Sequence, residues 1–203
     1  MQNLIKFTII IILLSQSSTV FSQVLKVNNG ISISSVKSKK GDMLSKSMSA
    51  YSFSLGVDYL EKEHFYLSSE IGYLKKGGKE ENEYLPEPYT NVKETWNYIH
   101  LNTTIRYPIR VQEVTHFFIG AGPALDILID SKKFKTSIYE GYELETIVPG
   151  LKGELGFMQD WNNIRFGLNF SYIYDLNKTA KTEFNSLKNN IYQVMFSIGY
   201  RIK

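Results

Sequence analysis

The feature that most constrains the fold is an unbroken alternation of residue types along the segment 164–176, IRFGLNFSYIYDL. Its even-numbered residues are aliphatic or aromatic, whereas its odd-numbered residues are small or polar, apart from Ile173. A period of two predicts a β-strand with one apolar face and one polar face. The apolar face must meet either a protein core, as in a soluble sandwich or ligand-binding barrel, or lipid.

Seven other segments of the chain alternate in the same way, and each is 11–14 residues long. Strands of soluble proteins typically have about five or six residues, whereas a tilted strand needs about 9–11 residues to cross the hydrocarbon of a bilayer. The lengths therefore favour a membrane barrel. The eight predicted strands are 24–36, 49–60, 64–74, 95–107, 116–129, 147–158, 164–176 and 190–202.

The connections between these strands alternate strictly between long and short. The long, polar connections are 37–48, 75–94, 130–146 and 177–189. The short ones are 61–63, 108–115 and 159–163. This rhythm is typical of an up-and-down barrel in the outer membrane, with short periplasmic turns and longer outer loops. We therefore predict an all-β, eight-stranded antiparallel transmembrane barrel with both termini on the short-turn side.

The two faces of the predicted strands differ in the way that a bilayer selects. On the apolar face, large aromatic residues lie mostly near the strand ends, with Leu, Val and Ile between them. The rows of alternate residues that begin at Tyr51 and Tyr192 and end at Tyr59 and Tyr200 are examples. Tyr rings prefer the headgroup level, so this order favours lipid on the apolar side. The opposite face carries many small residues, as expected for the narrow interior of an eight-stranded barrel.

That opposite face also carries charges of both signs. Buried charges are tolerated only when they are paired. We therefore predict a network of ion pairs that fills the lumen and has a structural role, in place of an open pore. The residues assigned to this lumen network are Asp58, Glu70, His100, Arg106, Lys152, Glu154, Arg165, Asp175 and Arg201.

The first segment of the chain differs from the rest. Lys6 precedes an apolar run, 7–14, and small polar residues follow, which is the pattern of a secretory signal peptide. We predict a signal peptide over 1–22, cleavage between Ser22 and Gln23, and a barrel domain over 23–203. The chain has no cysteine, which excludes a disulfide framework and a thiol nucleophile.

Two stretches resemble a known family. In 98–108, YIHLNTTIRYP, the positions of Tyr98, Arg106 and Tyr107 are similar to a strand of the PorT-like outer-membrane β-barrel domain of Bacteroidetes. The stretch 117–129, FFIGAGPALDILI, is similar to that family's next strand, with glycines and a proline in the expected places. The resemblance extends over nearly all of the mature chain and implies an outer-membrane location in the cell envelope.

Pro123 lies inside one of these predicted strands. Proline cannot donate a hydrogen bond to the ladder, and a closed barrel has no free edge where the missing donor would be harmless. We therefore expect a local bulge beside Gly122.

Catalysis receives little support from the sequence. If the fourth and fifth strands form a hairpin, His100 and His116 lie far apart along it, and His64 falls in a turn. The three histidines therefore cannot share a catalytic or metal site, and no cofactor motif is present. We predict no enzymatic activity, no metal and no cofactor. A lipid-modifying enzyme would require a nucleophile and a base together on the outer rim.

The expected partners follow from the location. The net charge of +3 is too small to indicate nucleic acid binding. The lysine-rich outer loops, which include Lys132, Lys133 and Lys135, would be placed to meet lipopolysaccharide phosphates, and the outer loops could contact a protein partner. The leading hypothesis is a non-enzymatic barrel with a structural or interaction role. The alternatives are a soluble exported barrel that binds a hydrophobic ligand and an accessory barrel of a protein export system.

Overall fold

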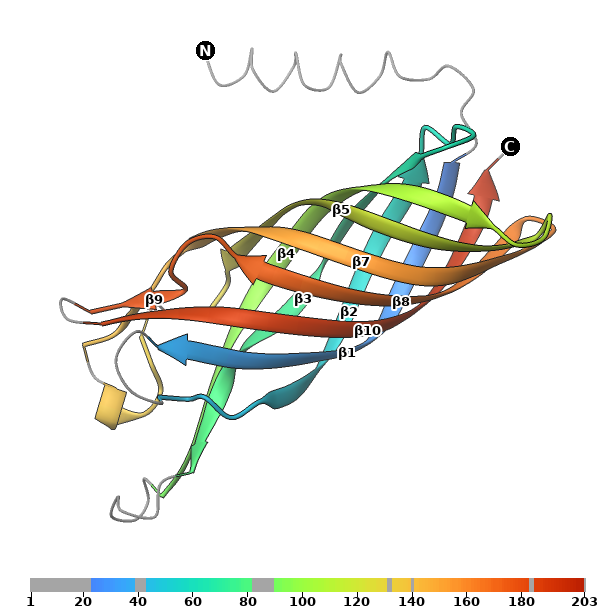
Figure 1. The fold of residues 1–203 in the computed structure, drawn as a ribbon. Helices are drawn as coiled ribbons and strands as arrows, with labels where there is room; N and C mark the ends of the chain where they lie inside the picture. Colours follow the sequence, from blue (N-terminus) through green and yellow to red (C-terminus); the bar gives the residue numbers. More distant parts are fainter. Residues whose placement is uncertain are drawn as a thin grey trace, which may run out of the picture.

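The computed structural model describes residues 23–38, 43–81, 90–130, 133–139, 141–182 and 185–202. The predicted signal peptide and the Ser22 side of the predicted cleavage site lie outside the described residues, and Gln23 is the first residue of β1. Long strands wrap around a common axis (Figure 1). The start of the first strand and the end of the last lie together, because Gln23 pairs with Ile202, at the end opposite the longer loops.

The sheet contains ten strands, all paired antiparallel, in an up-and-down order. Eight strands are long: β1 (Gln23–Ser38), β2 (Met48–Tyr59), β3 (Tyr66–Glu81), β4 (Asn91–Arg110), β5 (Thr115–Leu128), β7 (Ile147–Trp161), β8 (Ile164–Asp175) and β10 (Ser186–Ile202). The other two, β6 (Glu143–Leu144) and β9 (Ala180–Lys181), have two residues each, and a 3-10 helix, η1, covers Ser137–Tyr139. The all-β, up-and-down prediction is confirmed.

The predicted number of strands, eight, was wrong. The two additional strands lie in connections that the sequence indicated as loops, where they pair with each other and β9 also pairs with β10. Two-residue strands carry too short a pattern to be recognised by alternation. β1 pairs along its length with both β2 and β10, so it is not a free edge.

Three long strands extend at least four residues farther toward the long-loop end than the sequence indicated. β3 continues to Glu81, and β4 begins at Asn91, so these two strands form a hairpin that projects beyond the others (Figure 1). β10 begins at Ser186. The long connections are 39–47, 82–90, 129–146 and 176–185, and the short ones are 60–65, 111–114 and 162–163. Asn162 has a φ of 53°, which suits a two-residue hairpin turn.

The expected bulge beside Gly122 is absent. On one side of Pro123, Asn102 pairs with Ala124, and on the other side Ile105 pairs with Ala121. The offset between the strands is the same on both sides, so no residue is inserted. A Cβ at Gly122 would lie 2.0 Å from the Thr103 carbonyl oxygen. The strands therefore keep their register through close approach of backbone at a glycine, with two ladder pairs missing.

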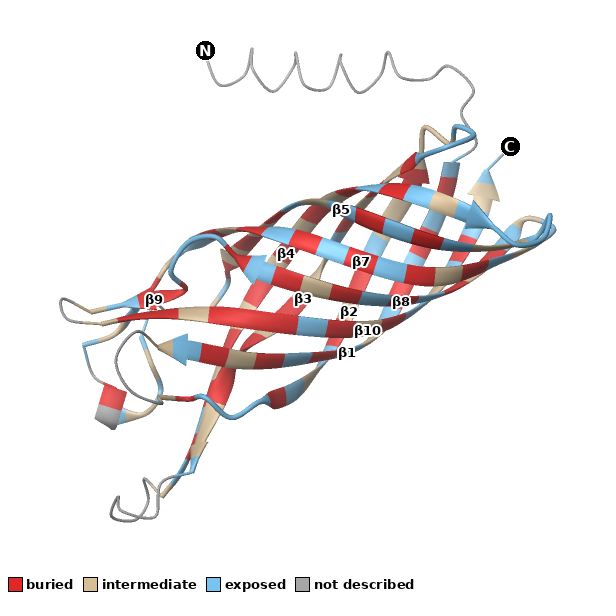
Figure 2. Cartoon of the chain, in the orientation of Figure 1, coloured by how far each residue is buried: buried red, intermediate tan, exposed pale blue. Residues whose placement is uncertain are grey.

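Burial alternates along most of the length of the long strands, as the red and pale blue stripes in Figure 2 show. Near the long-loop end, β3 and β10 instead have runs of consecutive buried residues. The outward rows are apolar: Leu155 is 58% exposed and Trp161 is 68% exposed. Since the charged side chains occupy the inward rows, the apolar rows cannot form the lining of an internal ligand pocket. A soluble barrel that holds a hydrophobic ligand is therefore not favoured.

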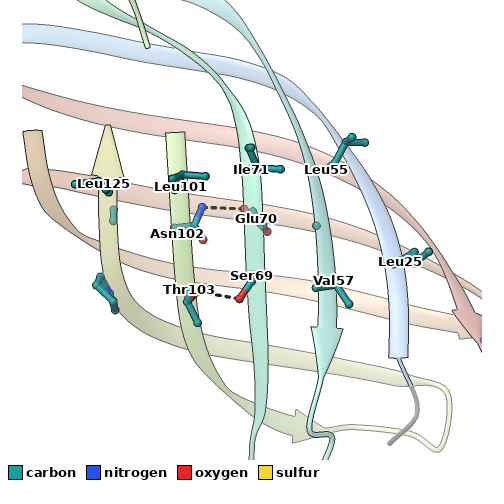
Figure 3. Close-up of a pocket in the computed structure, with 13 residues that line it drawn as sticks. Leu25, Leu55, Val57, Ser69, Glu70, Ile71, Leu101, Asn102, Thr103 and Leu125 are labelled. Carbon is teal, nitrogen blue, oxygen red and sulfur yellow. Dashed lines mark hydrogen bonds between the residues drawn. The ribbon is translucent and has the colours of Figure 1, made fainter. Parts of the chain in front are cut away.

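The outward face of β1 to β5 contains a shallow groove of about 750 Å³ (Figure 3). Leucines and Ile71 surround it, and the hydroxyls of Ser69 and Thr103 form a 2.8 Å hydrogen bond there. On the same strands, Glu70 and Asn102 point to the opposite side, into the interior. The two hydroxyls on the apolar face therefore satisfy each other, as the predicted lipid-facing surface would require.

Candidate functional site

The centre of the interior holds a cluster of charges from β3, β4 and β7. The Arg106 guanidinium donates from Nε to Glu154 Oε1 at 2.6 Å and from Nη2 to Glu70 Oε1 at 3.2 Å. Lys152 Nζ lies 2.9 Å from Glu70 Oε2 and 3.2 Å from Glu154 Oε2. All four side chains are at most 5% exposed. Among these four side chains, each carboxylate thus contacts both cations, and each cation contacts both carboxylates.

Two further charges from β1 and β2 complete this central cluster. Lys26 Nζ lies 2.8 Å from Asp58 Oδ1 and 3.0 Å from Glu70 Oε1. The charges are balanced, because three cations (Lys26, Arg106, Lys152) face three anions (Asp58, Glu70, Glu154). Such balance is what a buried ionic group needs.

Glycines on the inward rows make room for these long side chains. A Cβ at Gly56 would lie 2.9 Å from both the Glu70 side chain and the Lys26 side chain. Gly120 pairs with Arg106 across the ladder, and a Cβ at Gly120 would lie 2.9 Å from Arg106 Cγ. The Arg106 guanidinium also lies 4.5 Å from the centre of the Phe118 ring. The small residues and the charges are therefore parts of one packing arrangement.

A second cluster closes the short-turn end of the interior. Arg165 Nε lies 2.7 Å from Asp160 Oδ1, and Arg165 Nη1 lies 2.7 Å from Glu61 Oε1. Arg201 contacts the same two carboxylates, Glu61 at 2.6 Å and Asp160 at 3.1 Å. Arg165 is buried, whereas the Arg201 side chain is 25% exposed, so Arg201 lies at the rim. Arg165 also lies 3.5 Å from Asp58, which links this cluster to the central one.

A third cluster lies toward the long-loop end. Lys76 Nζ is 2.7 Å from both Asp126 Oδ2 and Asp175 Oδ1. The other Asp126 oxygen lies 2.5 Å from His100 Nδ1, and Thr179 donates to Asp175 at 2.8 Å. Lys76 and Asp175 are fully buried. Their charges therefore depend on one another for stabilisation.

Above the third cluster, an apolar cap covers the long-loop end. Its buried members include Trp96, whose ring lies 4.9 Å from that of Phe134 in an edge-to-face arrangement. Phe134 in turn contacts Tyr139 and Tyr142, at 5.7 and 5.4 Å between ring centres. Part of the connection 129–146 thus folds over the end of the strands.

Polar side chains of the β3–β4 hairpin hold this connection in place. The buried Glu94 carboxylate accepts hydrogen bonds from the backbone N–H groups of Lys135 and Thr136, at 3.2 and 2.7 Å. The Tyr139 hydroxyl donates to Glu80 at 2.6 Å. Burial, together with this carboxylate, raises the pKa of the Tyr139 hydroxyl. The lysine-rich connection is therefore attached to the hairpin through its backbone, and Lys132 lies outside the described residues.

The nine residues of the predicted lumen network occupy three different clusters. Glu70, Arg106, Lys152 and Glu154 meet directly, with Asp58 beside them; Arg165 and Arg201 lie at the short-turn end; His100 and Asp175 lie toward the cap. Sequence reasoning missed Lys26, Glu61, Lys76, Glu94, Asp126 and Asp160. Lys26, between Val24 and Asn28, continues the inward row of β1, so the alternation itself could have identified it.

The three histidines are well separated in the fold. His64 is exposed in the connection 60–65, near Glu63, whereas His100 is buried against Asp126. His116 pairs with Arg110 at the short-turn end. Within the part of the chain that the structure describes, no group of three His, Cys, Asp or Glu residues is placed to hold a metal ion. Among the same residues, no helix has the length and apolar character needed to cross a membrane.

The model of the outer membrane protein beta-barrel domain family matches residues 15–203. The chain belongs to this outer-membrane barrel family. The protein therefore lies in the outer membrane. No protein in the curated set matches the sequence.

Two solved structures illustrate the shared fold of this barrel family. The crystal structure of Neisserial surface protein A (NspA) has a TM-score of 0.53 and 12% identity, covering 89% of this chain and 97% of that one. The solid-state NMR structure of the outer membrane protein AlkL in DMPC bilayers has a TM-score of 0.50 and 11% identity, covering 92% and 94%. At these identities the likeness concerns the fold alone.

Proposed function

We propose that this protein is an integral outer-membrane barrel with a structural or interaction role in the envelope, that it is not an enzyme, and that its lumen is plugged. The eight long strands form the transmembrane wall, with the short connections in the periplasm and the long ones outside. The resemblance of 98–108 and 117–129 to PorT-like barrels supports placing it in that group of Bacteroidetes proteins.

The observation that carries this proposal is the succession of three charged clusters along the interior. The central cluster alone joins five strands, β1, β2, β3, β4 and β7, through Lys26, Asp58, Glu70, Arg106 and Glu154. A cluster of ion pairs inside a barrel whose wall has eight long strands leaves too little room for a water-filled channel. The central cluster holds the strands together and prevents ions and solutes from passing through the lumen.

The location of the titratable groups supports a non-enzymatic role. Catalysis on an external substrate requires a base that the substrate can reach. His100 and Asp126 are buried below the apolar cap, and their mutual hydrogen bond occupies Nδ1 of the histidine. The other Asp126 oxygen contacts Lys76, so this pair is built into the charged interior and an external substrate cannot reach it.

The outer loops are the proposed contact surface for a protein partner, and lipids of the outer membrane are the proposed surroundings of the apolar rows. Glu94 and Glu80 hold the loop that carries Tyr139 and Tyr142 against the β3–β4 hairpin. A loop held in one conformation loses less entropy when a partner binds it. No role in nucleic acid binding is proposed.

Two measurements test the proposal. The first is the gel mobility of the outer-membrane fraction, loaded with and without boiling in detergent, where a closed barrel shifts on heating. The second is ion conductance in planar lipid bilayers after insertion of the refolded protein. We expect a heat-dependent shift and no stable conductance steps. A stable open conductance would contradict the plugged lumen, and a soluble protein without a shift would contradict the barrel.

A further inference from the structure

A groove of about 710 Å³ lies on the outside of the wall, at the long-loop ends of β1, β8 and β10. The charged side chains that line it are Lys37, Lys178, Lys181, Lys188 and Glu145. Four positive charges and one negative charge give the groove a net charge of +3. Lys181 Nζ lies 2.6 Å from Glu145 Oε1, so this pair is already neutralised. The remaining three lysines carry the charge of the groove.

Two of these lysines face each other across neighbouring strands. Lys37 of β1 is the direct partner of Lys188 of β10, and both belong to the outward rows. Directly opposite residues have Cβ atoms about 4.5–5.5 Å apart, and like charges at that spacing are destabilising. Among the described residues, neither lysine has a carboxylate within 4.0 Å. The Lys188 ammonium donates to the Leu176 carbonyl at 2.7 Å, which leaves two of its protons for another acceptor.

An aromatic and apolar surface lies beside these lysines. The Lys188 ammonium is 5.5 Å from the centre of the Tyr174 ring, and Tyr174 and Leu176 also line the groove. Four residues closer to the middle of β10, Tyr192 lies against Tyr172, with 4.9 Å between ring centres. Tyr rings at this position mark the headgroup level of the bilayer. Lys37 and Lys188 therefore lie on the long-loop side of the headgroup level, next to the apolar outward rows.

We propose that this groove binds the phosphate group of a lipid in the outer leaflet, with Lys37 and Lys188 as the principal contacts and Lys178 as a third. A phosphate has several strong acceptor oxygens, so it can bridge two ammonium groups and remove their repulsion. The acyl chains of the same lipid then lie against Tyr174 and the apolar rows below. The inference rests on the proposed orientation of the barrel, with its long loops outside the cell.

The test is a binding titration by native mass spectrometry of the refolded protein in detergent micelles, with bisphosphorylated lipid A as the probe. The test variant is Lys37→Gln/Lys188→Gln. The matched control is Lys79→Gln/Lys93→Gln, which removes a second directly opposite lysine pair from the projecting β3–β4 hairpin. Every variant is first checked for the heat-dependent gel shift, so that loss of the barrel is distinguished from loss of the site.

We expect the test variant to bind lipid A roughly tenfold more weakly or worse, because two charges near the surface are removed. The control variant should bind like the wild type. Dephosphorylated lipid A should bind the wild type as weakly as the test variant binds the phosphorylated form. Equal affinity in the test variant, or an equal loss in the control, would overturn the proposal. Competition by millimolar inorganic phosphate would show a site for free phosphate, and would overturn the lipid assignment.

Discussion

Arg106→Met tests the central charged cluster most sharply. The substitution keeps an unbranched side chain beside the Phe118 ring and removes the positive charge that contacts Glu154 and Glu70. The central cluster then holds two cations, Lys26 and Lys152, against three anions. Removing one partner from a buried ion pair destabilises a protein by about 3–5 kcal/mol, because the other charge stays buried without compensation. We expect a loss of that size.

The assay is equilibrium unfolding in urea of the protein inserted in lipid vesicles, followed by gel mobility without boiling. Arg110→Met is the matched control, because Arg110 is an exposed arginine on the same strand. We expect a change within about 0.5 kcal/mol for it, as for most surface substitutions. Glu154→Gln added to Arg106→Met restores the balance of charge, and the double variant should be less destabilised than the two single variants summed.

An Arg106→Met variant that is as stable as Arg110→Met would contradict a stabilising role for the central cluster. Strict additivity in the double variant would contradict it too, because two residues joined by hydrogen bonds of 2.6 and 3.0 Å must be coupled if their contact contributes to stability.

Three other substitutions, the last with a matched control, test further contacts of the interior. Lys76→Met leaves two aspartates without their shared cation and should destabilise by about 3–5 kcal/mol, measured by the same urea titration. Trp96→Ala removes the centre of the apolar cap at a cost of about 3–5 kcal/mol, and should speed proteolysis of the outer loops while leaving the heat-dependent shift intact. Gly120→Ala forces a Cβ to within 2.9 Å of Arg106 and should cost about 1–3 kcal/mol, whereas Gly153→Ala, with open space around it, should be neutral in the same unfolding assay.

The wall of the barrel was predictable because its physical constraint is local. Alternation with a period of two determines which face of each strand is apolar, and Leu155 and Trp161 lie outward as that pattern requires. The alternation of long and short connections predicted the up-and-down, antiparallel order of the strands. The extensions of β3 and β4 were harder to predict, because Lys75, Gly77 and Gly78 look like loop residues, and their strand conformation depends on pairing with β4.

The interior was predictable in composition and only in part in its pairings. Charges of both signs on the inward rows indicated ion pairs, and Arg106 meets Glu154 as balance requires. Which carboxylate meets which cation depends on strand tilt and stagger, which set the height of each side chain. The sequence does not predict the ion pair between Lys76 and Asp126, because residue 76 falls in the predicted connection 75–94. Without Lys76, the predicted inward rows contain no cation that could be matched to Asp126. Contacts such as Lys76 with Asp126 depend on how the strands are arranged in three dimensions, which the sequence pattern of a single strand does not show.

Oxygen accessibility of spin labels tests most directly whether the apolar rows face lipid and the polar rows face inward. The chain has no cysteine, so single cysteines can be introduced without other changes. Nitroxides at Leu151 and Leu155 should be far more accessible to oxygen dissolved in the bilayer than nitroxides at the inward Ser52 and Ser54. Equal accessibility, or higher accessibility at the two serines, would contradict an outer-membrane barrel with a plugged polar interior.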